Sequence, residues 1–189
     1  MDQLRAAVIR TLFQRDARRV GVSLAITVTT SLVLFASVNA WRARPAPLAH
    51  AHASPEALAE AVIGAIGAGD VQRLQALVLT EEEFRTYVWP GLPASRPERN
   101  VPFEFVWDML HQKSVAYLRQ TIARFEGQPL TLVRVEFGGA ATAYDDVMVR
   151  RQTRFVVRTR DGAEQVIRMV GSTIEQDGRY KVFSYVVDE

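Results

Sequence analysis

The 189-residue chain contains no cysteine. This absence excludes a disulfide framework, a zinc site built on thiolates, a cysteine nucleophile and a lipid anchor attached to cysteine. The chain also lacks a P-loop, a dinucleotide-binding fingerprint, a nucleophile elbow, an EF-hand loop and a zinc-binding helix motif. We therefore expect no catalytic residues, no cofactor and no metal ion at a site that a sequence motif would define.

Net positive charge is confined to the N-terminal quarter of the chain. Residues 1–45 contain seven arginines and two acidic residues, whereas residues 46–189 contain 16 basic and 19 acidic residues. The pI of 9.2 therefore reflects the N-terminus, and the remaining part carries a small net negative charge. Nucleic-acid binding needs a basic stripe on the folded domain itself, so we expect no nucleic-acid partner.

One long hydrophobic run lies near the N-terminus. Residues 20–41 contain no charged side chain, and about 20 apolar residues in a helix suffice to cross the hydrocarbon core of a bilayer. Five arginines precede this run and two follow it before residue 46. The positive-inside bias then places residues 1–19 in the cytoplasm as a basic head and the part after residue 41 outside. We expect a transmembrane signal anchor at 20–41 in a single-pass membrane protein.

A cleaved signal peptide is the competing interpretation, because small residues end at Ala40 and at Ala53 in patterns that suit cleavage. Cleavage would leave a secreted or periplasmic protein. The hydrophobic core of a signal peptide usually spans about 7–15 residues, so the longer run and its 19-residue head favour an anchor. The head fits either an amphipathic helix on the inner leaflet or a disordered basic tail.

Residues 42–53 are rich in proline and alanine, and we expect a semi-rigid linker there. His50 and His52 alternate in this segment, but two histidines without a third ligand favour a solvated linker over a metal site. An extracytoplasmic domain is then expected over residues 54–189.

Helices are predicted in the first half of this domain. Ser54-Pro55 is a helix start, and Thr80 with Glu83 forms a capping box. A second short helix is expected over residues 71–78, and the capping box begins a third. A fourth, longer helix of about six turns is expected to end before Gly127 and Pro129. Its apolar stripe is Phe103, Val106, Trp107, Leu110, Ser114, Tyr117, Thr121, Ile122 and Phe125.

Alternating patterns in the second half predict strands. The runs are "PLTLVRVEF", "VMVRRQTRFVVRTR", "EQVIRMVGSTIE" and "RYKVFSYVV", and Asp-Gly turns at 160–163 and 176–179 predict hairpins between the last three. The segment "AATAYDD" is expected to be a turn. Helices followed by strands indicate an α+β domain, with the N-terminal helices packed on a curved four-stranded antiparallel sheet.

The helical pair with "AIGAGDVQRLQALV", the longer helix, the four strands and the closing "DGRYKVFSYV" resemble the nuclear transport factor 2-like superfamily over roughly residues 54–189. The resemblance implies a cone in which a curved sheet wraps around helices, often with a cavity. That superfamily includes isomerases, cyclase-like enzymes, binding proteins and scaffolds, so the fold does not specify the function. The single-pass layout is also similar to the inner-membrane scaffolds of type IV secretion and conjugation machinery.

Few residues suggest chemistry. Glu104, Asp108 and His111 share one flank of the long helix, where a charged surface is favoured over a metal or acid–base site. Tyr144, Asp145 and Asp146 contain groups that an isomerase needs, but nothing defines a partner for them.

Arg151 falls on the apolar side of its strand. An unpaired arginine there is costly, so we expect either a bulge that shifts the register or an ion pair with an acid or an anionic ligand.

The proline-rich connection before the long helix is longer than most connections, and such loops are often functional. We name Trp89, Arg96 and Arg99 there as candidate pocket or interface residues, together with Trp107, His111 and Arg151. Trp107 is expected to pack in the core and Trp89 to pin the loop. The loop then either caps a cavity above His111 or presents Arg96 and Arg99 to a partner.

The function expected from these patterns is a membrane-anchored interaction or assembly module with a protein partner or a homo-oligomeric state. A small-molecule carrier and an isomerase- or cyclase-like enzyme remain alternatives. An exposed apolar patch favours the first function, an enclosed apolar cavity favours the second, and a desolvated carboxylate or histidine in such a cavity favours the third.

Overall fold

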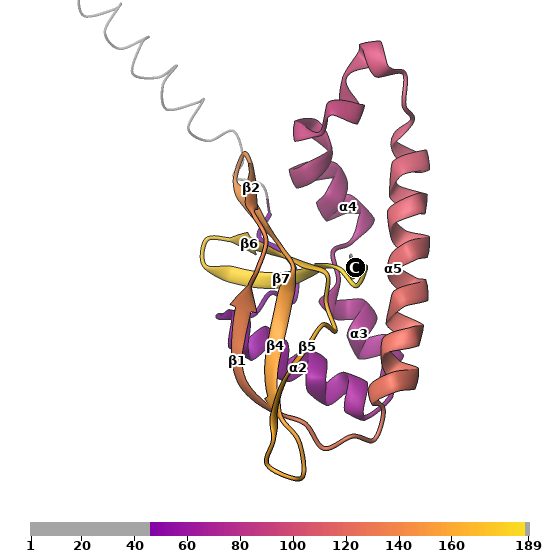
Figure 1. The fold of residues 1–189 in the computed structure, drawn as a ribbon. Helices are drawn as coiled ribbons and strands as arrows, with labels where there is room; N and C mark the ends of the chain where they lie inside the picture. Colours follow the sequence, from indigo (N-terminus) through magenta and orange to yellow (C-terminus); the bar gives the residue numbers. More distant parts are fainter. Residues whose placement is uncertain (1–45, 188–189) are drawn as a thin grey trace, which may run out of the picture. The chain divides into compact units, whose positions relative to one another are not determined.

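The computed structural model of the chain describes residues 46–187 (Figure 1). The predicted basic head and transmembrane helix lie outside these residues, and no described helix is long and apolar enough to cross a membrane. The helices are α2 (Pro55–Gly67), α3 (Val71–Leu77), α4 (Glu81–Glu83) and α5 (Phe103–Phe125), with four short helical turns η1–η4 between α4 and α5. The strands are β1 (Thr131–Phe137), β2 (Ala141–Tyr144), β3 (Val147–Arg151), β4 (Thr153–Arg158), β5 (Glu164–Ile167), β6 (Ser172–Gln176) and β7 (Arg179–Ser184). This element order confirms the α+β class.

The helix starts follow from local capping, as the sequence predicts. Ser54 Oγ accepts a hydrogen bond from the Ala57 N–H at 3.0 Å, with Pro55 in the first turn. Thr80 and Glu83 form the predicted reciprocal box, in which Glu83 Oε2 accepts from the Thr80 N–H at 2.8 Å. These side chains satisfy backbone donors that a helix N-terminus otherwise leaves without partners.

Most of the connection between α4 and α5 is helical. Helix α4 continues as a π-helical segment, η1 (Phe84–Val88), and three 3₁₀ turns follow at Trp89–Gly91, Pro93–Ser95 and Pro97–Arg99. Each 3₁₀ turn has a proline in its first two positions, where the fixed φ of proline suits a helical start. The proline-rich segment is therefore a series of short helical turns in which proline restricts the backbone at the start of each turn.

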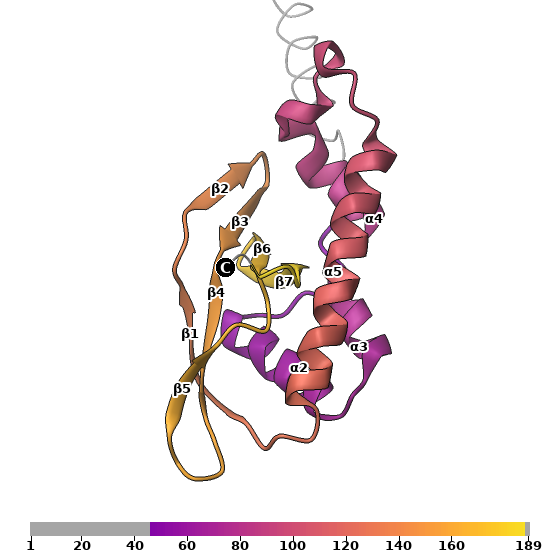
Figure 2. The same cartoon turned by 45° about the vertical axis from the view of Figure 1, so that its right-hand side comes forward.

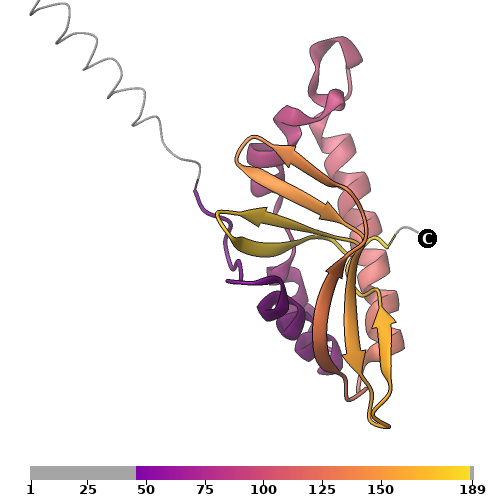
Figure 3. The same cartoon turned by 60° about the vertical axis from the view of Figure 1, so that its left-hand side comes forward.

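The strands form two antiparallel sheets, which corrects the prediction of a single four-stranded sheet. One sheet has the order β1-β4-β5 and the other the order β2-β3-β6-β7 (Figure 3). Both Asp-Gly turns make hairpins as predicted, and Asp177 and Gly178 adopt φ values of 49° and 72°. The prediction that "AATAYDD" is a turn is wrong in part, because residues 141–144 form strand β2, which pairs with β3.

The two sheets meet where the long predicted strands break. Between β3 and β4, Gln152 has a φ of 52°, which interrupts the regular extended backbone. Backbone hydrogen bonds still cross this junction, from the Gly138 N–H to the Gln152 carbonyl at 3.1 Å and from the Thr153 N–H to the Gly171 carbonyl at 3.2 Å. The β2–β3 hairpin therefore turns away from β1, β4 and β5 (Figure 3).

The hydrophobic core consists of two clusters. The larger one joins α2, α3 and the second half of α5 to β4, and the smaller one lies beneath the α4–α5 connection. Leu48 and Ala51 belong to the smaller cluster and are buried. The compact unit accordingly begins at Pro47, so residues 47–53 pack on the domain where the sequence predicts a linker.

Candidate functional site

Residues 81–113 form a helical hairpin, which we call the helical arm. It comprises α4, the four short turns and the first half of α5, and Figures 1 and 2 show its two sides running next to each other. The turn that joins the two sides carries Arg96 and Arg99, and both side chains are exposed. The arm therefore presents these two predicted interface residues at its tip.

Tilted and edge-on aromatic contacts hold the two sides of the arm together. The ring of Phe84 lies 5.9 Å from that of Phe103 and 5.6 Å from that of Trp107, and Trp89 meets Phe103 edge-on at 5.4 Å. Arg85 places its guanidinium 3.6 Å from the centre of the Phe103 ring. Such pairs contribute beyond the area they bury. Trp107 packs against the smaller core cluster and Trp89 pins the loop, which is the packing that the sequence predicts for both.

The first half of α5 is exposed on the side that faces away from this aromatic cluster. No residue from Glu104 to Lys113 is buried. Phe105 is 63% exposed and Met109 is 45% exposed, and one helical turn separates them on a common face. Sequence analysis did not name these two residues, although their spacing of four, off the main apolar stripe, was a signal that could have identified them.

An open groove of about 370 Å³ lies where the arm meets the rest of the domain. Trp107, His111 and Ser114 of α5 line one side of it, and Gln75 and residues 78–81 line the other. The ring of His111 stacks on that of Trp107 at 5.5 Å and remains exposed. At the inner end, Ser114 Oγ accepts a hydrogen bond from the Tyr185 N–H at 3.1 Å. The groove is mostly apolar, and Glu81 is the acidic residue that borders it.

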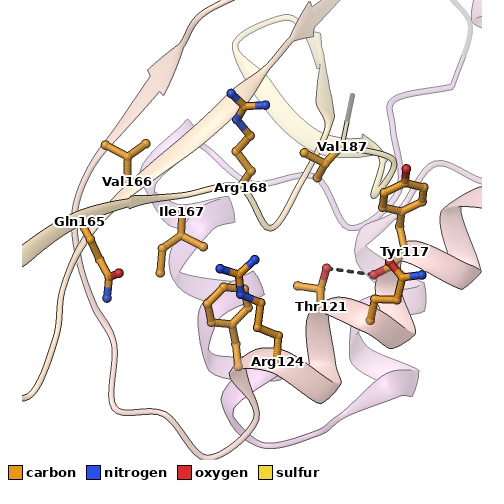
Figure 4. A pocket seen from close by; sticks show the side chains of 10 residues that line it. Tyr117, Thr121, Arg124, Gln165, Val166, Ile167, Arg168 and Val187 are labelled. Atoms are coloured by element: carbon orange, nitrogen blue, oxygen red, sulfur yellow. Dashed lines mark hydrogen bonds between the residues drawn. The ribbon is translucent and has the colours of Figure 1, made fainter. Parts of the chain in front are cut away.

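A second open pocket, of about 460 Å³, lies between the end of α5 and strand β5. Figure 4 shows Arg124 and Thr121 on the helix side and Gln165 and Ile167 on the strand side. Thr121 donates to the Tyr117 carbonyl at 2.9 Å. This hydrogen bond is internal to the helix. No acidic side chain and no histidine is among the described residues that line the pocket, so it is a polar recess without a preformed acid–base pair.

The predicted histidine pair lines a third open pocket, of about 350 Å³, together with Arg73. His52 exchanges two backbone hydrogen bonds with Tyr180, each of 2.8 Å. Burial, then the charges of Arg73 and Arg179, lower the pKa of His52. Within residues 46–187 there is no group of three or more histidine and acidic side chains that could hold a metal ion. The triple Glu104, Asp108 and His111 is thus not assembled, and Glu104 instead lies 3.6 Å from Arg85.

Most of the residues predicted from strand patterns are exposed, and one of them, Tyr144, contacts the arm. Arg151 is the last residue of β3 and is exposed beside the break at Gln152. The pairing of β3 with β6 runs to Arg151 without a register shift, so the predicted bulge does not account for its position. The neighbouring Arg150 makes the ion pair instead, at 2.8 Å from Glu175. Asp145 and Asp146 are exposed in the β2–β3 turn, and the Tyr144 ring packs beside Gly91 of the arm.

Sequence reasoning missed a buried ion pair. Lys181 of β7 has no exposed surface, and its Nζ lies 2.7 and 2.9 Å from the two carboxylate oxygens of Glu83. Glu83 also accepts hydrogen bonds from the Thr80 and Ala49 N–H groups, each at 2.8 Å. Burial acts to raise the pKa of Glu83, but these hydrogen bonds and the charge of Lys181 together hold it below its usual value. The carboxylate borders none of the three pockets described above.

Comparison of the chain with protein-family models, with curated proteins and with solved structures gives no match.

Proposed function

We propose that this chain is a membrane-anchored extracytoplasmic interaction or assembly module without catalytic activity of its own, and that its helical arm contacts a partner protein. The observation that carries the proposal is the ten-residue stretch of α5 without a buried residue, in which Phe105 and Met109 are exposed side by side. Adjacent large apolar residues at a projecting surface are typical anchors of protein interfaces.

The arm is suited to this role because it is held rigid from within. Phe84, Phe103 and Trp107 occupy its inner face, so the outward side chains of α5 are not needed to hold its two sides together. A preformed helix face loses little conformational freedom on binding. The proposal includes the nuclear transport factor 2-like relationship and the anchor at residues 20–41, which together would place the arm outside the membrane.

The enzyme alternative has weaker support. A catalytic acid or base is a titratable group that is desolvated and faces a pocket. Glu83 is the acidic residue among the buried ones, but Lys181 neutralises it and it faces protein groups. His111 borders a groove but is exposed. These two environments are those of a structural ion pair and of a surface side chain.

A photo-reactive phenylalanine analogue at position 105 of the full chain tests the proposal in cells. We expect covalent adducts with another protein chain at Phe105. The matched control is Val71 of α3, an apolar residue that is 44% exposed but lies outside the arm, and it should give none. Equal labelling at both positions, or no adduct at Phe105, would contradict the proposal.

A small-molecule carrier is the second candidate, because the groove beside Trp107 and His111 is mostly apolar and its volume lies within the usual range of ligand pockets. The half-buried Val115 lines this groove. A carrier should co-purify with a small molecule that mass spectrometry detects, and V115F should displace it by filling the groove. If the purified chain carries no such molecule, the carrier function fails.

A further inference from the structure

Six exposed residues form one continuous line along the outer face of α5. They follow one another at steps of four, three, four, three and four, and they are Phe105, Met109, Gln112, Ala116, Arg119 and Ala123. At 100° per residue, all six fall within about 40° of Phe105. We call this line the α5 seam.

The α5 seam points away from the domain. The buried residues of α5, such as Ser114, Leu118 and Thr121, lie on the opposite side of the helix by the same angular count. In Figures 1 and 2, α5 forms the side of the domain opposite β1 and β2. A seam of alternating three- and four-residue steps is the spacing with which helices pack in coiled coils, and it extends here over about 27 Å.

The two ends of the α5 seam differ in size and in charge. The large apolar side chains Phe105 and Met109 lie at the start, whereas Ala116 and Ala123 lie toward the end. The acidic residue that borders the start is Asp108, and Arg119 lies on the seam near its end. The start of the seam, which is large and acidic, therefore complements the end of the seam on a second copy that runs in the opposite direction, because that end is small and basic.

We propose that the α5 seam binds the same seam of a second copy of this chain, in antiparallel orientation. The two-fold axis passes level with Ser114, so that Phe105 packs on Ala123 of the second copy and Met109 packs beside Arg119. Gln112 then meets Ala116. The interface is closed and self-complementary, as in most homodimers. This inference rests on the proposed function and names the partner as a second copy.

Side-chain size and charge together favour this orientation over the parallel one. In the antiparallel pair, Asp108 of each copy lies beside Arg119 of the other, on the same flank of the seam, and the two-fold symmetry makes this contact twice. A parallel pair would place Asp108 beside Lys113 of the other copy, but it would set Arg119 against Arg119 and pack Phe105 on Phe105, which leaves the small side chains at the other end of the seam without a large partner. Like charges that face each other across helices disfavour pairing.

The proposed register also brings one pair of like charges together, and this contact can be used to test the register. Lys113 borders the α5 seam next to the axis, so the two copies of Lys113 lie near each other. Lys113→Gln removes that repulsion, and we expect it to increase dimer formation by about twofold to fivefold. One helix face is a small interface, so the dimer should form reversibly and depend on concentration.

Disulfide cross-linking tests the orientation without background, because the chain has no cysteine. Full-length F105C and A123C are mixed and oxidised. We expect a cross-linked species of roughly twice 21.2 kDa in the mixture, and none from either variant alone, since the two positions are about 27 Å apart along the helix. E104C, exposed on α5 but off the α5 seam, is mixed with A123C as the matched control.

Three results would overturn the proposal: cross-linking of F105C with itself, which indicates a parallel pair, equal cross-linking of the E104C control, and no cross-link in the mixture while circular dichroism shows folded protein. A charge swap provides a second test. D108R and R119D should each weaken the dimer about tenfold, and the double variant D108R/R119D should restore it. Failure of the double variant to recover would contradict the proposed register.

The experiments separate this inference from the proposed function. If the photo-reactive residue at Phe105 captures a different protein and the cysteine mixture gives no cross-link, the second copy is wrong and the interaction module stands. If Phe105 captures no chain at all, both proposals fail.

Discussion

At the scale of single residues, the Lys181–Glu83 ion pair connects three parts of the domain that are far apart in sequence. Lys181 comes from the last strand and Glu83 from helix α4. The Glu83 carboxylate also accepts a hydrogen bond from the Ala49 N–H, which connects the segment before α2 to the pair. A buried charge is costly unless it is paired and hydrogen-bonded. Both requirements are met here, and the pair therefore fixes how these three segments fit together.

Lys181→Met should destabilise the domain strongly. The substitution keeps much of the side-chain volume but leaves the Glu83 carboxylate buried without its counter-charge, which typically costs about 3–5 kcal/mol. Urea unfolding at neutral pH measures the change. The double variant E83Q/K181M removes both charges, and we expect it to recover a large part of the loss. Equal destabilisation of both variants would show that the charge pairing is not the cause.

The same pair makes stability depend on pH in the acidic range. Because the folded-state pKa of Glu83 is lowered from 4.5, its contribution is fully present above the unfolded pKa and is lost as the pH falls through the folded pKa. In K181M the lowering hydrogen bond and charge are gone. Unfolding midpoints measured from neutral pH down to pH 3 should then fall less steeply in K181M than in the natural chain.

At the scale of elements, the junction between the two sheets depends on a close backbone approach at Gly171. Its N–H donates to the Ser184 carbonyl at 3.0 Å, and its carbonyl accepts from the Thr153 N–H at 3.2 Å. A Cβ at this position would collide with the Val186 carbonyl oxygen. Glycine thus allows β6 to begin where three chain segments meet.

Two glycine substitutions should have opposite effects for this reason. Gly171→Ala should destabilise the domain by about 2 kcal/mol or more, since the backbone of β7 or its extension must shift. Gly64→Ala should stabilise it by about 0.5–1 kcal/mol, because Gly64 is in the interior of α2 with no atom near its Cβ position. Thermal unfolding measures both, and a stabilising G171A would disprove the close approach.

At the scale of the whole molecule, the proposed arrangement has a basic head, an anchor at residues 20–41 and an exported domain. The uneven charge of the sequence supports it, since the arginines cluster before the uncharged run. An anchor would hold copies of the domain at one surface, and this raises the effective concentration for a weak contact between their arms.

The full chain expressed in a bacterial host should therefore remain with membranes after extraction at alkaline pH. The N-terminus of the recovered chain should still contain residues 1–19. Protease added outside the cytoplasmic membrane should reach the domain and cleave it only in exposed loops or after it unfolds. Mass determination of the intact chain checks the first point. A mature protein that begins at Trp41 or Ser54 would show that the segment is a cleaved signal peptide.

The candidate site could be predicted in part. Trp89 and Trp107 were expected to pack, and they do so through Phe84 and Phe103. Phe105 and Met109 were missed because spacing along a helix defines its faces, while the face that other elements cover is decided by packing. For Arg151, sequence alternation indicated a conflict, and the strand avoids it by ending at this residue, where the side chain is exposed.

The sequence by itself determined what depends on nearby residues: the helix starts at Ser54 and Thr80, the length of α5, the hairpins at Asp-Gly and the placement of charge. These features need interactions across only a few positions. The tertiary structure alone decided the division into two sheets, the burial of Leu48 and Ala51, and the Lys181–Glu83 pair, whose members are 98 positions apart. These depend on contacts between distant segments, and the packing of the whole domain selects those contacts because local preferences leave them open.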